Sequence, residues 1–465
     1  MTDKRVGRRA FLGVAGVAAG AAVVPNSAGA QDATGPTAYV GNRSGTLHAL
    51  DAESGDEIWA FETGRAIRSA PTVVNGTVYF GSDDNNLYAV DASLGTEQWA
   101  FDAGGPVRSD PSVVGGTVYV GSDDGHLRAV DARDGTEQWA YESGGAVQTA
   151  PAVTDRRVLV GSADTGVHAV NRNDGTEDWV FSAGGPVNSS PIPADGTVYA
   201  GSDDAFFYAI DERRGTERWV CDSWNCDPNG PIASDPTVVD ETVYFGSDDS
   251  VLHAIESDTD IERWTFSASR AIRSSPTVVD GTVYFGSDDT NLYAVDTAEG
   301  NQTWFFGARQ GIQASPTVAA GTVYVGSLDE NVYAVDAESG DREWTFDTGQ
   351  RVFSAGTVVA EPRGGHSVDS RVVYGASGHR EYGTEYEDRS FGSYLAADGD
   401  DEQEPTADGN GEDGGDGGSD TGEGNDGTTE VDEEVIVELP GFGIGAAVAG
   451  LCGGYLFSKF GSDEE

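Results

Sequence analysis

The stretch AVDARDGTEQW (Ala129–Trp139) decides how this chain folds, because its spacing of Ala, Asp, Gly and Trp recurs along most of the sequence. The preceding copy places Ala89, Asp91, Gly95 and Trp99 at the same intervals. Asp accepts hydrogen bonds from turn amides, Gly adopts left-handed backbone angles, and Trp offers a large surface for packing. The element therefore predicts a turn between two strands that is docked onto a neighbouring unit by its tryptophan.

The tryptophans give the period of the repeat. Consecutive members of the series are separated by 40, 40, 40, 40, 45, 40 and 40 residues, and only Trp224 falls outside it. The docking tryptophans are Trp59, Trp99, Trp139, Trp179, Trp219, Trp264, Trp304 and Trp344. A period near forty with strand-like content is typical of a β-propeller, so eight tryptophans predict eight blades.

Each repeat contains four short strands. In the copy around Trp139 the expected strands cover 111–114, 116–121, 126–131 and 137–141, rich in β-branched and aromatic residues and separated by Asp- and Gly-containing turns. The first copy, from Thr37, lacks its innermost strand. We expect the segment 352–359 to supply it and so close the ring, which removes exposed sheet edges. Residues 371–398 have strand-like pieces, at 371–374 and 393–395, that the pattern does not place.

The charge is extreme. Lys+Arg 27 against Asp+Glu 79 gives 27 − 79 = −52. Such self-repulsion is tolerable in molar salt, where the Debye length is about 3 Å. The composition resembles that of proteins from extreme halophiles; an acidic tail on an ordinary protein is the alternative, although Asp pairs recur inside most repeats. This acidity argues against nucleic acid as a partner.

The amino-terminal residues 1–30 are typical of an export signal. Arg8-Arg9 is followed by Phe11-Leu12, an apolar run and a small-residue cleavage region near Ala30. The paired arginines resemble a twin-arginine signal, with an ordinary secretory signal as the alternative. Residues 37–398 are then expected to form the propeller.

The carboxyl-terminal part is expected to tether the propeller to a membrane. Residues 399–434 consist almost wholly of Gly, Asp, Glu, Ser and Thr and predict a disordered acidic linker. Residues 435–465 contain an apolar run that ends at Phe457 and is just long enough to span a bilayer, with a buried helix as the alternative. Its Pro-Gly-Phe start at 440–442 resembles the archaeal sorting signal at which the tail is exchanged for a lipid, although its basic cluster is reduced to Lys459. We expect an exported, membrane-anchored, cell-surface protein.

The one irregular interval contains a candidate functional loop. The stretch Cys221–Pro231 holds the five extra residues of the 45-residue spacing, together with Trp224. A local disulfide between Cys221 and Cys226 is possible in an exported protein. Insertions on a regular scaffold are often where function is placed.

The repeat resembles the tryptophan-docking repeat of the pyrroloquinoline-quinone propeller superfamily, over roughly residues 37–359. That superfamily includes eight-bladed quinoprotein alcohol dehydrogenases and the cofactor-free propeller subunit of the bacterial outer-membrane barrel assembly machinery. The dehydrogenases have a calcium site, a catalytic Asp and a disulfide between adjacent cysteines. Here no two cysteines are adjacent and no Asp stands out as a base. We expect a non-catalytic binding or scaffolding module without a cofactor; a quinone- and calcium-dependent oxidoreductase is the alternative.

A ring of variable residues is the strongest candidate for a binding site. The position before each Ser/Thr/Ala-x-Pro element (Ser-x-Gly in the last copy) is expected at one mouth of the central channel, and from copy to copy it holds Arg68, Arg108, Gln148, Asn188, Ala233, Arg273, Gln313 and Phe353. Arg68, Arg108 and Arg273, with Gln148, Gln313 and Trp224, are the candidate residues for an anionic ligand or an envelope protein with an acidic segment. The alternative is that the arginines offset neighbouring carboxylates.

No metal site is expected. The Asp pairs, such as Asp83-Asp84 and Asp123-Asp124, repeat at the same turn, which favours turn preference and surface charge over calcium binding. His48, His168 and His253 occupy a strand position that holds Tyr in other copies, which indicates packing.

Overall fold

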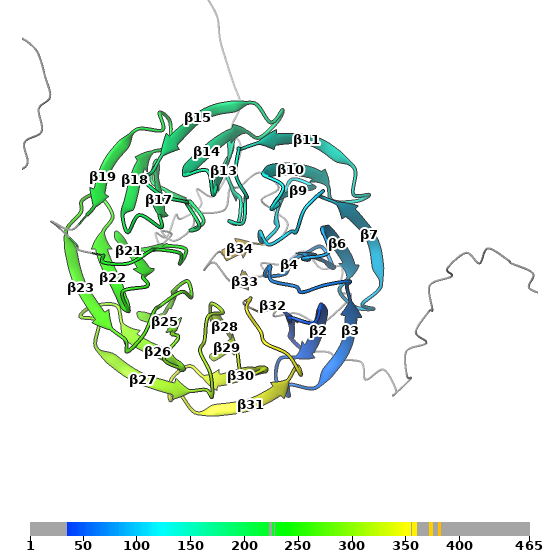
Figure 1. The fold of residues 1–465 in the computed structure, drawn as a ribbon. Coiled ribbons are helices and arrows are strands. Elements are labelled where there is room, and N and C mark those ends of the chain that lie inside the picture. Colours follow the sequence, from blue (N-terminus) through cyan, green and yellow to red (C-terminus); the bar gives the residue numbers. More distant parts are fainter. Residues whose placement is uncertain are drawn as a thin grey trace, which may run out of the picture. The chain divides into compact units, whose positions relative to one another are not determined.

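The computed structural model of the protein describes residues 35–222, 226, 228–354 and 356–359, and the backbone of 372–374 and 380–382. All belong to the first of two units, Met1–Gly399 and Asp400–Glu465, into which the chain divides. The described residues form eight sheets arranged as a ring and contain no helix (Figure 1). The predicted all-β, eight-bladed propeller of four-stranded blades is confirmed. The predicted signal, linker and anchor lie outside the described residues.

Seven blades consist of four consecutive antiparallel strands, the first innermost and the fourth outermost (Figure 1). Blade 2 contains β4 (Thr72–Val74), β5 (Thr77–Gly81), β6 (Asn86–Asp91) and β7 (Glu97–Asp102). Blade 3 contains β8 (Ser112–Val114), β9 (Thr117–Gly121), β10 (His126–Asp131) and β11 (Glu137–Glu142). Blade 4 contains β12 (Ala152–Val153), β13 (Arg157–Gly161), β14 (Gly166–Asn171) and β15 (Glu177–Ser182).

The same order holds in the next four blades. Blade 5 contains β16 (Ile192–Ala194), β17 (Thr197–Gly201), β18 (Phe207–Asp211) and β19 (Glu217–Cys221). Blade 6 contains β20 (Thr237–Val239), β21 (Thr242–Gly246), β22 (Val251–Glu256) and β23 (Glu262–Ser267). Blade 7 contains β24 (Thr277–Val279), β25 (Thr282–Gly286), β26 (Asn291–Asp296) and β27 (Gln302–Gly307). Blade 8 contains β28 (Thr317–Ala319), β29 (Thr322–Gly326), β30 (Asn331–Asp336) and β31 (Arg342–Asp347).

Blade 1 joins the two ends of the repeat array. Its sheet contains β1 (Thr37–Gly41), β2 (Thr46–Asp51) and β3 (Glu57–Glu62), and β32 (Thr357–Val359) pairs with β1 so that Tyr39 lies opposite Thr357. The expected closure of the ring by the segment 352–359 is therefore confirmed. Two further strands, β33 (Val372–Tyr374) and β34 (Arg380–Tyr382), extend this sheet toward the centre of the ring (Figure 1). The strand-like piece at 393–395 lies outside the described residues.

Burial explains why the strands have these sequences. The second strand of a blade, such as TVYFG in β5, is buried at every residue. Alternate side chains of a strand point to opposite faces, so a strand buried throughout must lie between two other sheets. The outermost strands are exposed at alternate residues, as in β31. Apolar residues therefore fill the space between successive blades.

The tryptophans bind each blade to the next. Every indole Nε1 of the series donates a hydrogen bond of 2.9–3.1 Å to a backbone carbonyl in the next blade. The acceptors, in the order of the tryptophans, are Ala92, Ala132, Arg172, Glu212, Ser257, Thr297, Ala337 and Ala52. The last bond, from Trp344 to Ala52, closes the ring.

The glycine of the repeat is required for two reasons. Gly135 has a φ of 72°, which disfavours side chains, and a Cβ placed there would lie 2.9 Å from the ring of Trp99. The Asp of the same element fixes the turn, because Asp91 Oδ1 accepts hydrogen bonds of 2.9 Å from the backbone N–H groups of Ser93 and Leu94. Asp and Gly of one repeat thus shape the turn on which the tryptophan of the preceding blade docks.

Candidate functional site

One face of the propeller carries the candidate site. Antiparallel order places two kinds of segment on it: the crossing from the outermost strand of one blade to the innermost strand of the next, and the turn between the second and third strands of each blade. Backbone hydrogen bonds join them; Ile67 N donates to Asn42 O, and Asp83 N donates to Ala66 O. We call this the crossing face. The ring of variable residues lies on its crossings, and the Asp pairs lie on its turns.

The first Asp of each pair binds the ring residues. Asp83 accepts a bond of 3.1 Å from Nε of Arg68 in its own blade and one of 2.8 Å from Nε of Arg108 in the next blade. Arg108 continues the series, since its Nη1 lies 2.9 Å from Asp123. Asp123 in turn accepts a bond of 2.7 Å from Nε2 of Gln148. Alternating guanidinium, amide and carboxylate groups therefore run from blade to blade, and we call this series the belt.

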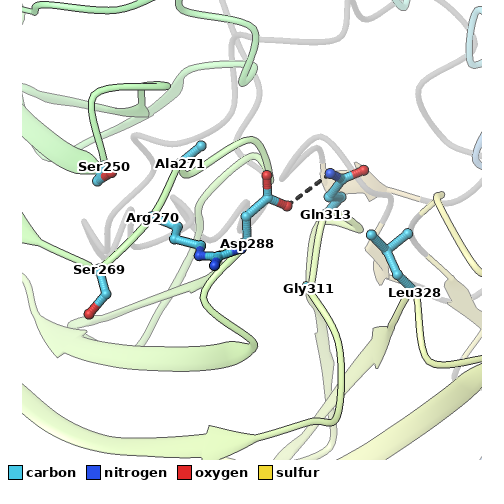
Figure 2. A pocket seen from close by; sticks show the side chains of 8 residues that line it. All are labelled: Ser250, Ser269, Arg270, Ala271, Asp288, Gly311, Gln313 and Leu328. Carbon is cyan, nitrogen blue, oxygen red and sulfur yellow. Dashed lines mark hydrogen bonds between the residues drawn. The ribbon is translucent and has the colours of Figure 1, made fainter.

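The belt continues on the other side of the ring. Arg273 donates to Asp248 through Nε at 2.8 Å and Nη2 at 2.9 Å, and its Nη1 lies 3.3 Å from Asp288. Gln313 Nε2 donates to Asp288 at 2.8 Å, as Figure 2 shows. The hydrogen bond to Asp248 is the largest cause that raises the pKa of Arg273. These contacts agree with the alternative interpretation of the ring, in which its arginines offset neighbouring carboxylates. Ligand binding by Arg68, Arg108 and Arg273 stays a prediction.

The second Asp of each pair accepts hydrogen bonds from groups other than the ring residues. Asp84 accepts hydrogen bonds of 2.8 Å from the backbone N–H of Gly64 in the crossing and from the hydroxyl of Tyr88. His168 takes the place of this tyrosine in blade 4, with its Nε2 3.1 Å from Asp164. The second Asp thus ties the turn to the crossing. In the described part of the chain no group of three or more His, Cys, Asp or Glu residues is arranged to hold a metal ion.

The belt is incomplete at Ala233. By the register of the repeat this residue stands between Asp203 and Asp248, at a position where every other copy except that of Phe353 has Arg or an amide. Asp203 keeps one belt bond, of 2.8 Å from Nδ2 of Asn188. Burial, followed by repulsion from Asp248 and Asp204, raises the pKa of Asp203 against the effect of the Asn188 bond. The neighbouring carboxylates are therefore less well compensated here than at Arg108.

The belt also lacks a carboxylate at Ala163 of blade 4, and it is interrupted over a longer stretch across blades 8 and 1. The position of the first Asp holds Leu328 in blade 8 and Arg43 in blade 1, and the ring position between them holds Phe353. The guanidinium of Arg68 lies 4.8 Å from the centroid of the Phe353 ring, in a cation–π contact. We call Leu328, Phe353 and Arg43 the belt break. It replaces two carboxylates by an apolar side chain and a cation.

A pocket adjoins the belt break. It has a volume of about 540 Å³ and is lined by residues of blades 6, 7 and 8 (Figure 2). Its lining residues are Ser250, Ser269, Arg270, Ala271, Asp288, Gly311, Gln313 and Leu328. The pocket therefore combines the guanidinium of Arg270, two hydroxyl groups and the side chain of Leu328 with the carboxylate of Asp288, which is bound to Gln313.

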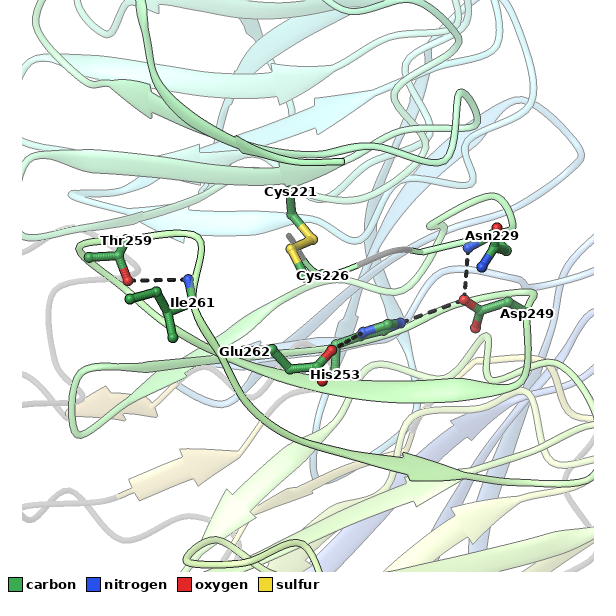
Figure 3. The surroundings of a disulfide bond; sticks show 8 residues. All are labelled: Cys221, Cys226, Asn229, Asp249, His253, Thr259, Ile261 and Glu262. Atoms are coloured by element: carbon green, nitrogen blue, oxygen red, sulfur yellow. Dashed lines mark hydrogen bonds and ion pairs between the residues drawn. A yellow bond between two sulfur atoms is a disulfide. The ribbon is translucent and has the colours of Figure 1, made fainter. Parts of the chain in front are cut away.

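The inserted loop lies next to the turn of blade 6 that contains Asp249. Cys221 and Cys226 are joined by a disulfide, with their Cα atoms 5.5 Å apart (Figure 3). The backbone N–H of Asn229 donates to Asp249 at 2.9 Å, and His253 lies between Asp249 and Glu262 (Figure 3). His253 is buried and stacks on Phe245 with ring centroids 5.0 Å apart. Trp224, the candidate residue of this loop, lies outside the described residues.

Two aspartates, Asp110 and Asp235, stand just before the innermost strands of blades 3 and 6, and the charge of Asp235 acts on Asp110. Asp110 accepts a bond of 2.6 Å from the backbone N–H of Ala70, and Asp235 accepts one of 2.6 Å from that of Ser190. Burial raises the pKa of Asp110 to about 7, and repulsion from Asp235 adds to the increase. Sequence reasoning missed this pair, because each Asp stands in a Ser-Asp-Pro element where other copies have Ala or Ser.

Sequence reasoning also missed the belt break. The Asp pairs look like a uniform repeat, because five of the eight copies have Asp at the first position. A comparison of the copies at that position shows Arg43, Ala163 and Leu328 among the five aspartates. The signal was therefore present in the sequence.

Three groups of known proteins resemble the chain. The family model described as outer membrane protein assembly factor BamB matches residues 43–151, 123–259 and 247–380. The crystal structure of BamB from Moraxella catarrhalis superposes with a TM-score of 0.54 at 17% identity, over 73% of this chain and 98% of that chain. A quinohemoprotein alcohol dehydrogenase from Comamonas testosteroni superposes with a TM-score of 0.53 at 15% identity, over 65% and 72%. A computationally designed protein, Ika8, gives 0.56 at 16% identity, over 70% and 95%. No curated protein sequence matches the chain.

Proposed function

Because the chain belongs to the family of the outer membrane protein assembly factor BamB, we propose that it is a non-catalytic binding or scaffolding module of the cell envelope. The description of the family is that of an outer membrane protein assembly factor. The predicted export signal at 1–30, the predicted linker at 399–434 and the apolar segment at 435–465 support the proposal that the protein is displayed on the outer surface of the membrane. The described part of the chain contains no helix able to span a membrane.

The observation that carries this proposal is where the repeats differ. Strand sequences, docking tryptophans and turn glycines are nearly uniform from blade to blade, whereas the ring, the first Asp position and the inserted loop vary. The ring and the first Asp position both lie on the crossing face. A ligand site on a repeat scaffold needs positions that are not equivalent. The crossing face is therefore the surface that we assign to a partner, with an envelope protein as its class.

The residues present do not fit a quinone site of the kind that the superfamily resemblance implies. The disulfide here bridges Cys221 and Cys226 across a loop, rather than two adjacent cysteines. The belt aspartates at the mouth, such as Asp83 and Asp288, already bind the side chains of the ring. We therefore derive no step through a quinone or calcium.

Affinity capture tests the proposed function. The full-length protein, immobilised through a tag, is incubated with solubilised envelope in molar salt, and the retained proteins are identified. We expect a defined envelope protein to be retained in stoichiometric amount. Quinone absorption and dye reduction after incubation with pyrroloquinoline quinone and calcium, without a retained protein, would contradict the proposal and support the oxidoreductase instead.

A further inference from the structure

The belt break is where the first Asp position lacks a carboxylate in two successive blades. Across blades 2, 3, 5, 6 and 7 the first Asp position holds a carboxylate, whereas blade 1 has Arg43 followed by Ser44 in place of both members of the Asp pair. Leu328 removes the carboxylate of blade 8. Two successive blades of a strongly acidic protein thus present no belt carboxylate at the channel mouth.

Arginines gather around this break. Arg270, Arg309, Arg351, Arg43 and Arg65 lie on crossings or turns of blades 7, 8, 1 and 2, and all five are exposed. Unlike the belt arginines, none of them forms an ion pair in the described part of the chain. We call these five residues the arginine arc.

Backbone hydrogen bonds hold the arc together. Arg43 N donates to Arg351 O at 3.0 Å, which joins the turn of blade 1 to the crossing that precedes β32. Thr63 N, two residues before Arg65, donates to Gly45 O at 2.7 Å. The cations of blades 1 and 2 are therefore carried by segments that are fixed relative to one another, which lowers the entropy that a ligand must remove on binding.

Apolar side chains accompany the arc. Leu328 lines the 540 Å³ pocket together with Arg270 and with Asp288, whose carboxylate already binds Gln313 and Arg273. Phe353 lies on the adjacent ring position, where Arg68 covers it. Neither apolar side chain is fully buried. An apolar side chain and an anionic group of the same ligand can thus be accommodated side by side.

We propose that the belt break and the arginine arc bind an extended, acidic segment of a partner protein that also carries an apolar side chain. The inference rests on the proposed binding function and deepens it by giving the partner's chemistry. Planar guanidinium groups bind carboxylates in bidentate fashion, and such short-range bonds persist when salt screens long-range attraction. An arc spread over four blades suits an extended chain better than a single small anion. A nucleic acid is disfavoured by the charge of −52.

Peptide binding tests this inference on the full-length protein in molar salt. The probe is a labelled synthetic peptide of Glu and Gly with one Phe, compared with the same peptide carrying Gln for Glu or Ala for Phe. Two variants change the site: Arg43→Asp restores the residue type of the other blades, and Arg43→Gln with Arg351→Gln removes two charges. The matched control is Arg156→Gln with Arg213→Gln, because both are exposed arginines without ion pairs in the described chain and lie on turns of the opposite face.

We expect the parent and the matched control to bind the Glu/Phe peptide equally, and each site variant to bind it roughly tenfold more weakly, which is the loss of about 1.4 kcal/mol. Equal binding by the parent and both site variants would overturn the inference, as would tighter binding of a single-stranded DNA oligonucleotide than of the peptide. A parent that retains an envelope protein but does not bind the peptide would overturn the inference alone and leave the proposed function standing.

Discussion

The guanidinium of Arg108 lies 2.8 Å from the carboxylate of Asp83, which belongs to the preceding blade. The same guanidinium lies 2.9 Å from Asp123 of its own blade, so one side chain bridges two carboxylates of neighbouring sheets. Arg273 repeats the arrangement with Asp248 and Asp288. Charge compensation at the channel mouth is therefore built from contacts between blades, in addition to the tryptophan docking between them.

The gap at Ala233 predicts a stabilising substitution. In the variant Ala233→Arg the new guanidinium is placed between Asp203 and Asp248, as Arg108 is between Asp83 and Asp123, and it relieves the repulsion that helps to raise the pKa of Asp203. These carboxylates are partly exposed, so we expect a gain of roughly 0.5 to 1 kcal/mol in the free energy of unfolding.

Thermal unfolding of the parent, Ala233→Arg and Ala233→Gln in the same buffer measures this effect. Gln supplies hydrogen-bond donors without charge, and we expect its gain to be smaller. A midpoint of Ala233→Arg at or below that of the parent would contradict the belt as a stabilising series.

The docked turns predict that two glycines differ in their tolerance of alanine. Gly135 and Gly116 have similar φ values of 72° and 77°, but a Cβ at Gly135 would lie 2.9 Å from the Trp99 ring, whereas nothing lies within 4 Å of one at Gly116. Gly135→Ala therefore adds a clash to the backbone strain that both variants share. We expect it to cost roughly 1 to 3 kcal/mol more than Gly116→Ala.

Chemical denaturation of the two variants checks this difference, with Gly116→Ala as the matched control. Equal losses would mean that the repeat glycine is required only for its backbone angle, and that indole packing onto it contributes little.

Asp110 predicts a pH dependence of stability. Its pKa is raised from 3.8 to about 7 by burial, with repulsion from Asp235 as a further cause. Between these two values the native state binds a proton that the unfolded state lacks, so the contribution of Asp110 to stability falls as the pH rises, by about 1.4 kcal/mol for each pH unit. We expect Asp110→Asn to lessen this fall, because the amide oxygen can still accept the Ala70 N–H without carrying charge.

Unfolding midpoints of the parent and Asp110→Asn from pH 4 to pH 8 measure the effect. The curves are expected to diverge as the pH rises, with the variant the more stable at pH 8. Parallel curves would show that Asp110 ionises at its ordinary pKa.

The fold was predictable because the same residues with structural roles recur in most copies of the repeat. Trp99, Gly135 and Asp91 each have a local role that the residue type alone indicates, and the 40-residue period fixes the number of blades. The strands β33 and β34 were not placed, because they extend a sheet that is already complete and have no counterpart in other copies. The pairing of Arg108 with Asp83 was also out of reach, since it depends on the geometry between blades. The belt break was visible in the sequence at Arg43 and Leu328, but its meaning depends on knowing that the first Asp binds the ring.

The central claim, that the crossing face binds an envelope partner, is tested most directly by capture with a variant of the belt. Changing Arg68, Arg108 and Arg273 together to Gln removes the cations that bind Asp83, Asp123, Asp248 and Asp288 and makes the channel mouth more negative. These side chains are 35%, 35% and 46% exposed, so the cost in folding free energy is at most about 1 kcal/mol for each pair.

The measurement is the yield of envelope protein retained by the triple variant beside the parent, in molar salt, together with the thermal midpoint of each. We predict a clearly lower yield from a variant that remains folded and unfolds only a few degrees below the parent. An undiminished yield from the folded variant would contradict binding at this face.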